Sequence, residues 1–182
     1  MRLERGKTGK RVENIQAVAK AAPEPFLEVL VGTLGLILII FVHGASIRFI
    51  NRHFSERWVH VTARTARWRV NLLLAGTIAA LSITHFVETL LWAIPISASG
   101  MIPTMRESYY FVLESYTTLG EGSVALPERW RLIGPIIAMS GLFTFGWTGS
   151  LLVNIMTDFN KLDRSRAARK KNETLDSGPD HP

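Results

Sequence analysis

Two groups of residues in this 182-residue chain have types and spacings that suit cation binding. The first is the run Thr117-Thr118-Leu119-Gly120-Glu121-Gly122, in which one residue separates two glycines. Glycine accepts positive φ without a Cβ penalty, so alternating glycines let successive backbone carbonyls point the same way. Carbonyls aligned in this manner can replace the hydration shell of a cation. The run is therefore a candidate ion-binding segment.

The second group lies within apolar sequence. His85 and Glu88 are three residues apart and so share one face of a helix, and His43 is a third candidate member. Ionisable groups inside a membrane span are costly unless paired, which makes them candidates for function. The three residues predict either a cluster that senses protons or a metal ion, or a satisfied hydrogen bond between helices. The hydrogen bond is the simpler interpretation.

A haem ligated by His43 and His85 is an alternative from a different class of protein. It requires both histidines at matched depth on facing helices. His85 is expected in the outer half of its span and His43 near the cytoplasmic end of its own, so their depths disagree. The sequence His85-Phe86-Val87-Glu88 is not a zincin His-Glu-x-x-His motif, and no Gly-x-Ser-x-Gly elbow occurs. We therefore expect a protein that is not an enzyme and has no cofactor.

Three apolar runs must position these residues. They hold 19, 27 and 25 residues, and Glu88 is their only Asp, Glu, Lys or Arg. A helix needs roughly 20 apolar residues to cross a hydrocarbon core of ~30 Å, so the sequence predicts an all-α membrane protein with three transmembrane helices. The predicted spans are about Phe26–Phe49, Val70–Ile96 and Arg131–Thr157. The absence of cysteine excludes disulfides and thiolate metal sites.

The remaining sequence is basic or polar. We divide the chain into a basic N-terminal tail (1–25), a first span with a basic connector (26–69), a pore domain (70–157) and a polar cytoplasmic tail (158–182). The tail is expected to begin as a helix and fade into disorder. In the connector an aromatic and aliphatic stripe predicts a short helix lying in the membrane interface, with a simple loop as the alternative. The stripe consists of Phe54, Trp58, Val61 and Trp68.

The formal net charge of +6 flanks the apolar runs, which favours contact with anionic lipid headgroups over nucleic acid. The segment Arg48–Arg69 holds six Arg against the single Glu56, and the positive-inside rule places the connector in the cytoplasm with the last tail. The segment 93–131 is then external. Three spans also put the N-terminus outside, in conflict with its six basic residues. Either that tail is an exception, or the first span is not a full crossing.

A half-length helix is predicted just before the glycine run. Thr104-Met105-Arg106-Glu107 has the pattern of a capping box, which begins a helix. The following Ser108–Tyr116 is only about nine residues, too short to span but suited to a re-entrant half-helix. The negative C-terminal end of this helix would favour a cation at the glycine run. Irregular backbone at membrane depth persists only where it is buried or lines water.

The stretch Tyr110–Met156 resembles the pore region of bacterial potassium channels of the two-span pore-loop family. It shares the pore helix, the Thr-Thr-Leu-Gly-x-Gly filter, the segment Leu126–Leu132 and a following span with glycines. The three-span layout is similar to small bacterial channel-like proteins with an extra N-terminal span. The resemblance implies a homotetrameric cation channel of the plasma membrane (the bacterial inner membrane). A re-entrant pore helix and a selectivity-filter loop would lie between its second and third spans.

The resemblance also implies roles for individual residues. Potassium or another cation would bind the carbonyls of Thr118, Leu119, Gly120 and Glu121, together with the Thr118 hydroxyl. Gly141 or Gly146 would be a gate hinge, with close helix packing as the alternative. In the same way Glu114 would support the filter, either as a neutral carboxyl bonded to backbone or as a proton sensor.

Two residues depart from the family pattern. Glu121 stands where potassium-selective members carry Tyr or Phe, and Ser123 stands where they carry Asp, the partner of the position that Glu114 matches. Four copies of Glu121 would form an acidic ring able to concentrate cations or bind a divalent ion. Potassium-selective, weakly selective monovalent, and divalent-conducting or non-conducting proteins all stay open. A non-conducting membrane sensor or accessory protein on a channel scaffold is the main alternative function.

Overall fold

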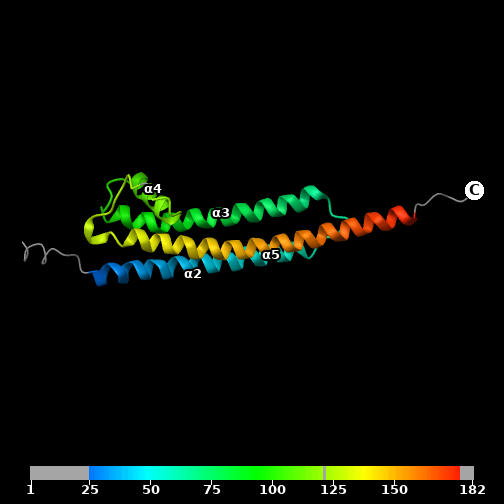
Figure 1. Ribbon diagram of the computed structural model, residues 1–182, viewed down its shortest axis with the longest axis horizontal. Helices are drawn as coiled ribbons and strands as arrows, with labels where there is room; N and C mark the ends of the chain where they lie inside the picture. The colour runs from blue at the N-terminus through cyan, green and yellow to red at the C-terminus, as the bar shows by residue number, and fades with distance from the viewer. Residues whose placement is uncertain (1–24, 121, 177–182) are drawn as a thin grey trace, which may run out of the picture.

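The computed structural model describes residues 25–120 and 122–176. Within these residues the chain is all-helical and has no strand. Three long helices lie along one another, and a shorter helix packs beside one end of them (Figure 1). The elements in chain order are α2 (Pro25–Trp58), α3 (Arg67–Ala98), α4 (Met105–Tyr116), the 3-10 turn η1 (Glu128–Trp130) and α5 (Ile133–Asp176). The predicted basic tail lies, up to residue 24, outside the described residues.

The three long helices make this chain a multi-pass membrane protein. Each of α2, α3 and α5 is long and apolar enough to cross a membrane. Large apolar side chains also cover the outside of the bundle, among them Phe41 at 72 % and Leu142 at 62 % exposure. Such a surface is suited to lipid tails and not to water. The prediction of three transmembrane helices is confirmed at this level.

The prediction of a separate interfacial helix after the first span is wrong. Helix α2 does not end near Phe49 but continues to Trp58, and only residues 59–66 connect it to α3. Phe54 is buried, and the Trp58 ring lies 4.8 Å from the ring of Phe159 on α5. Phe54 and Trp58 of the predicted stripe therefore pack into the bundle, whereas Trp68 is 63 % exposed. Because this packing continues the helix–helix interface, the Arg-containing segment stays helical.

The polar tail is also more helical than predicted. Helix α5 continues through residue 158 without a break and ends at Asp176. Pairs such as Lys161–Asp158 and Arg169–Glu173 lie one turn apart on this part of the helix and support it. Arg166 donates a hydrogen bond to the Thr65 carbonyl, with a distance of 2.8 Å between the two atoms. The tail is thus tied to the α2–α3 connection.

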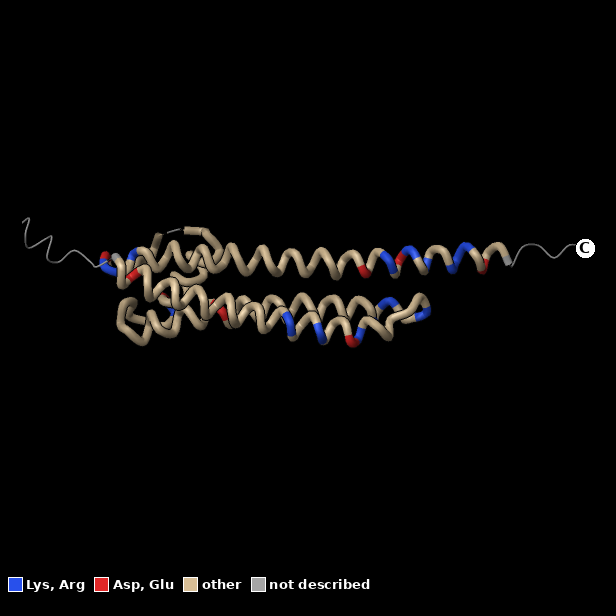
Figure 2. Tube along the Cα trace, turned by 90° about the horizontal axis from the view of Figure 1, so that it is seen from below, with Lys and Arg blue, Asp and Glu red and all other residues tan. Residues whose placement is uncertain are grey.

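The bundle has two apolar clusters, one at each end. The α4 core joins all four helices where α4 packs, and its buried members include Ile39, Trp92, Val112, Tyr116 and Ile137. The distal core joins α2, α3 and α5 towards the α2–α3 connection, and consists of Ile47, Ile50, Phe54, Leu81, Leu151 and Ile155. Figure 2 shows that Lys and Arg gather at the distal end, on the α2–α3 connection and the last turns of α5.

The start of α2 lies at the same end of the bundle as α4. The buried carboxylate of Glu28, in the first turn of α2, accepts a hydrogen bond from the Leu132 backbone N–H just before α5. This contact satisfies one of the free N–H groups at a helix start. Since α2 has 34 residues and α3 has 32, α2 is long enough for a full crossing. The conflict between the basic N-terminal tail and the charge rule is therefore not resolved by a partial first span.

Candidate pore segment and buried polar cluster

Helix α4 begins as the capping box predicts. The Thr104 hydroxyl accepts a hydrogen bond from the Glu107 backbone N–H, and its own hydrogen is directed to the Glu107 carboxylate, both at 3.2 Å. The helix has 12 residues, which at ~1.5 Å per residue gives a length of ~18 Å. That is little more than half of a ~30 Å hydrocarbon core. Buried Ser108, Val112 and Tyr116 line the face that packs on the long helices.

The backbone after α4 alternates in conformation. Thr117 is the C-cap, and the Leu119 N–H still reaches back to the Glu114 carbonyl at 2.8 Å. Positive φ angles then occur at every second residue: 59° at Thr118, 64° at Gly120 and 72° at Gly122. The expectation that both glycines adopt positive φ is confirmed. Thr118 is the only non-glycine residue with positive φ among those described, and for a β-branched side chain this conformation is strained.

The described residues of the glycine run are exposed, whereas the residues of α4 just before it are buried or half-buried. Thr117, Thr118, Leu119 and Gly120 are all exposed on the single chain, and Leu119 is 63 % exposed. Glu121 lies outside the described residues, so its predicted role in the filter is not placed. A pocket of about 280 Å³ beside the run is lined by Thr118 and Gly120 together with residues of α4 and the start of α5.

The two predicted filter supports have opposite environments. Glu114 is buried at 4 % exposure, and its Oε1 atom has no hydrogen-bond partner among the described residues. Ser123 is exposed. An unpartnered buried carboxyl oxygen is rare and costly, so it marks a place where the single chain is incomplete or strained.

The two candidate hinge glycines of α5 also differ. A Cβ at Gly141 would collide with the backbone carbonyl of Tyr116, at the last turn of α4. A Cβ at Gly146 would meet nothing within 4 Å. Gly141 therefore fits the alternative of close helix packing, because it lets α5 approach the C-terminal end of α4. The helix continues through both positions.

His43, His85 and Glu88 lie together in the middle of the bundle and form the centre of a buried polar cluster. The His43 Nδ1 atom is 2.7 Å from Glu88 Oε1, and the two imidazole ring centroids are 5.4 Å apart. His43 and Glu88 have 0 % exposure, and the His85 side chain is 14 % exposed. These groups lie in an apolar interior, where an unpaired charge is expensive, so the contacts among them are needed.

Tyr116 connects this cluster to α4. Its hydroxyl donates to Glu88 Oε2 at 2.6 Å, lies 2.9 Å from His85 Nδ1, and also contacts the hydroxyl of Thr144 on α5. The Thr148 hydroxyl completes the set, 3.1 Å from His85 Nε2 and 3.4 Å from the other imidazole. We call these six side chains the polar cluster: His43, His85, Glu88, Tyr116, Thr144 and Thr148. They come from α2, α3, α4 and α5.

The depth argument against a contact between the two histidines is wrong. Because α2 extends to Trp58, His43 lies near the middle of its helix and not near the end. His85 likewise lies near the middle of α3. The rings are side by side, all four of their nitrogens have polar contacts, and Thr148 bridges them.

Sequence reasoning missed the three hydroxyl residues of the polar cluster. Thr144 and Thr148 are four residues apart and so share a face of α5, the same relation that singled out His85 and Glu88. Tyr116 is the last residue of α4. A phenol that enters an apolar core needs a hydrogen-bond partner for its hydroxyl. Both signals were present in the sequence, but neither names the partner on another helix.

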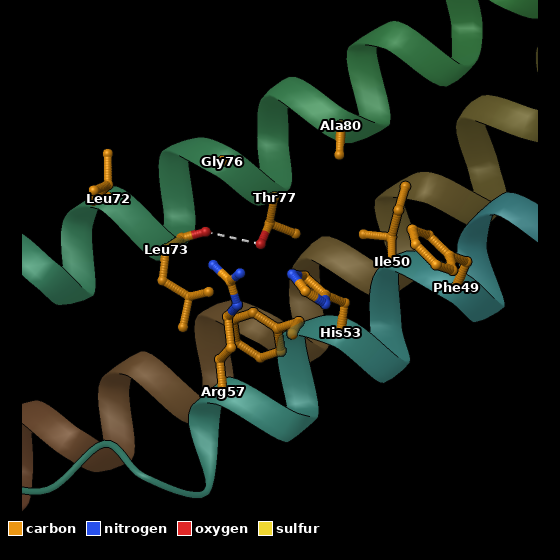
Figure 3. Close-up of a pocket in the computed structure, with 10 residues that line it drawn as sticks. Phe49, Ile50, His53, Arg57, Leu72, Leu73, Gly76, Thr77 and Ala80 are labelled. Atoms are coloured by element: carbon orange, nitrogen blue, oxygen red, sulfur yellow. Dashed lines mark hydrogen bonds between the residues drawn. The ribbon is translucent and has the colours of Figure 1, made fainter.

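A further pocket lies away from the polar cluster. It measures about 200 Å³ and is formed between the last turns of α2 and the first half of α3 (Figure 3). His53 and Arg57 extend into it, and the Thr77 hydroxyl donates to the Leu73 carbonyl at 2.8 Å. Its other lining residues are apolar, and no carboxylate is among them. It therefore offers neither an acid–base pair nor a cation site.

Comparison of this chain with protein-family models, with curated proteins and with solved structures finds no match. The chemistry of the site therefore stands on the residues and contacts described above.

Proposed function

We propose that this chain is one subunit of a homotetrameric cation channel, in which Thr117–Gly122 of each copy line a carbonyl filter. The observation that carries the proposal is the positive φ at Thr118, Gly120 and Gly122, directly after a helix too short to cross a membrane. Alternation between left-handed and ordinary backbone turns successive carbonyls towards one side, where they can coordinate a dehydrated ion.

Helix α4 supplies a favourable field for such an ion. The last carbonyls of a helix carry about half a negative charge, and here they precede the filter residues directly. The exposure of Thr117–Gly120 on a single chain also fits the proposal. In a tetramer the remaining wall of the pore comes from three further copies, so these residues would face the ion pathway and not lipid.

The transported ion in this proposal is K⁺ or another monovalent cation. The acidic side chain of Glu121, in the position where potassium-selective relatives carry an aromatic ring, argues for weaker discrimination among cations or for divalent-ion binding. The basic distal end would face the cytoplasm and the α4 end the outside, with the chain in the bacterial inner membrane.

Ion flux into liposomes that contain the purified protein tests the proposal. Gly120→Ala places a Cβ at a φ of 64° and should abolish K⁺ and Na⁺ flux, because the filter backbone must change conformation. Gly100→Ala is the matched control, since Gly100 has a φ of 72° and also has open space around it, but lies in the α3–α4 connection. The control should conduct like the wild type. Absence of flux in confirmed wild-type tetramers would overturn the channel proposal.

Selectivity is tested in the same assay with K⁺, Na⁺ and Ca²⁺. Glu121→Tyr restores the family aromatic and should increase the ratio of K⁺ to Na⁺ flux. An unchanged ratio would contradict the weight given to Glu121. If Gly120→Ala leaves the cellular role of the protein intact, a non-conducting sensor or accessory protein is favoured.

A further inference from the structure

Four side chains of the polar cluster bring metal-binding atoms together between α2, α3 and α4. His43 Nδ1 lies 2.7 Å from Oε1 of Glu88, and the Tyr116 phenol oxygen lies 2.6 Å from Oε2 of the same carboxylate. His85 Nδ1 lies 2.9 Å from the phenol oxygen and 3.5 Å from Glu88 Oε2. The two histidines and Glu88 each offer a ligand atom within 4.8 Å of the others. Such a constellation is a candidate metal site.

The hydrogens of this cluster do not satisfy all of its contacts while both imidazoles are neutral. An ionised Glu88 only accepts, so His43 Nδ1 donates to it and His43 Nε2 is left as an acceptor. The Thr148 hydroxyl has one hydrogen, which then goes to His43, and His85 Nε2 must donate to Thr148. His85 Nδ1 then takes the Tyr116 hydrogen, so none remains between Tyr116 and Glu88. One additional cation removes the conflict.

The charge of the cluster leads to the same requirement. Glu88 is fully buried, and no Lys or Arg is paired with it among the described residues. A lone carboxylate in a membrane interior is expensive, so a positive partner is needed. Either a proton or a metal ion can supply that charge.

We propose that the polar cluster binds one divalent ion of the zinc type, with His43, His85, Glu88 and Tyr116 as ligands. Two imidazole nitrogens with one carboxylate and one phenol form a mixed nitrogen–oxygen set, which suits Zn²⁺ or Co²⁺ and not K⁺, Mg²⁺ or Ca²⁺. A tetrahedron with metal–ligand bonds of about 2.0–2.1 Å has edges of roughly 3.3 Å. Three of the observed contacts, at 2.6, 2.7 and 2.9 Å, are shorter than this edge, and the fourth is 3.5 Å, so the ligand atoms must move apart by about half an ångström when the metal binds.

Thr148 is placed to orient both ligating rings. When both Nδ1 atoms bind the metal, both Nε2 atoms carry hydrogen and donate to the Thr148 hydroxyl. A hydroxyl oxygen has two acceptor lone pairs, so it accepts both bonds. Contacts of this kind fix the tautomer and the ring orientation of metal-binding histidines. The metal-bound state therefore satisfies the contacts that conflict in the neutral cluster.

A metal at this position would connect three helices immediately before Thr117. Tyr116 is the last residue of α4, and its hydroxyl would be held to α2 and α3 through the ion. The site would fix the end of the pore helix whether or not the chain conducts ions. The inference does not rest on the proposed channel function.

Calorimetric titration of chelator-treated, purified full-length protein with ZnSO₄ tests the proposal. One Zn²⁺ per chain is expected, and Co²⁺ should give the visible absorption bands of a tetrahedral complex. His43→Gln and Glu88→Gln should each weaken Zn²⁺ binding by 100-fold or more. Thr148→Val, which keeps the side-chain shape, should weaken it by roughly 10–100-fold. His53→Gln and His60→Gln are the matched controls, because both residues are exposed and outside the cluster, and should bind as the wild type does.

Measurements on the wild type and on the variants can both overturn the inference. X-ray absorption at the zinc edge of the wild type should show two imidazole ligands and no sulfur. Absence of stoichiometric Zn²⁺ binding at pH 8 would overturn the inference, and binding lost only in the His53 and His60 variants would place the ion at the surface and not in the cluster. Folded variants at His43 and Glu88 that retain full affinity would lead to the same conclusion.

Discussion

The two ends of the helix bundle are held together by different kinds of interaction. Around α4, four helices are joined through the polar cluster, and the Trp92 indole N–H also donates to the Ser140 hydroxyl at 3.1 Å. In the distal core the contacts are apolar and aromatic, as in the stacking of Phe54 with Phe159 at 6.5 Å between ring centroids. Hydrogen bonds between side chains of different long helices are confined to the first region among the residues described.

This difference reflects what each end has to position. Lipid tails compete well with apolar side chains, so apolar contacts between membrane helices are weakly directional. Helices that cross the membrane are already oriented by it, and packing is sufficient for them. Helix α4 has only 12 residues and does not span, so its end needs directional contacts. Tyr116 provides them at the residue before the candidate filter.

The largest effect is expected from Glu88→Ala. The substitution leaves the His43 and Tyr116 side chains without their buried partner. A buried hydrogen-bonding group left without its partner costs about 1–3 kcal/mol, and two such groups are left here, so the free energy of unfolding should fall by about 2–6 kcal/mol. Unfolding of the purified protein in detergent, followed by circular dichroism, measures the change. Glu56→Ala is the control, because that carboxylate is exposed and pairs only with Arg52 on the same helix, and should unfold as the wild type does.

The second-largest effect on stability is expected at one of two glycines of α5, which we compare. Gly141→Ala forces the helix away from the Tyr116 carbonyl and should lower the free energy of unfolding by about 1–3 kcal/mol. Gly146→Ala adds a methyl group to open space and should increase it by up to about 1 kcal/mol, because alanine favours the helix. If both glycines are hinges of a gate, both variants will instead alter ion flux with little change in stability.

A substitution in the distal core should lower the stability of the protein without changing the candidate filter. Phe54→Ala leaves a cavity among Leu81, Ile155 and Phe159, and should lower the free energy of unfolding by about 1–2 kcal/mol. The value is smaller than for a water-soluble core because the unfolded segments in the membrane also have apolar surroundings. If the protein conducts ions as proposed, ion flux per folded protein should stay at the wild-type level. A loss of flux as large as for Gly120→Ala would show that the two ends are coupled.

The long helices and the start of α4 could be predicted from the sequence because their signals are local. Apolar runs longer than a membrane core dictate the spans, and Thr104 with Glu107 dictates a helix start within four residues. The positive φ at Gly120 follows from the absence of a Cβ. None of these inferences requires knowledge of which helices touch.

The other features depend on contacts between distant residues. Helix α2 continues to Trp58 because Phe54 and Trp58 pack against Phe159, which is about a hundred positions away in the chain. The same extension places His43 at the depth of His85, so an error in one helix boundary led to the wrong expectation that the two histidines lie at different depths. Register between helices is set by tertiary packing, and hydropathy alone does not report it.

The smallest effect is expected from a single neutral hydrogen bond at the α4 end. Ser140→Ala removes the acceptor of the Trp92 indole, and hydrogen bonds between membrane helices contribute about 0.6 kcal/mol on average. Ser82→Ala is the control, because that hydroxyl is exposed and bonds only to the Ile78 carbonyl of its own helix. A loss in Ser140→Ala as large as in Glu88→Ala would mean that α4 is held by many equivalent polar contacts. A small loss, with the large one confined to the polar cluster, would mean that Glu88 and its partners position the end of α4.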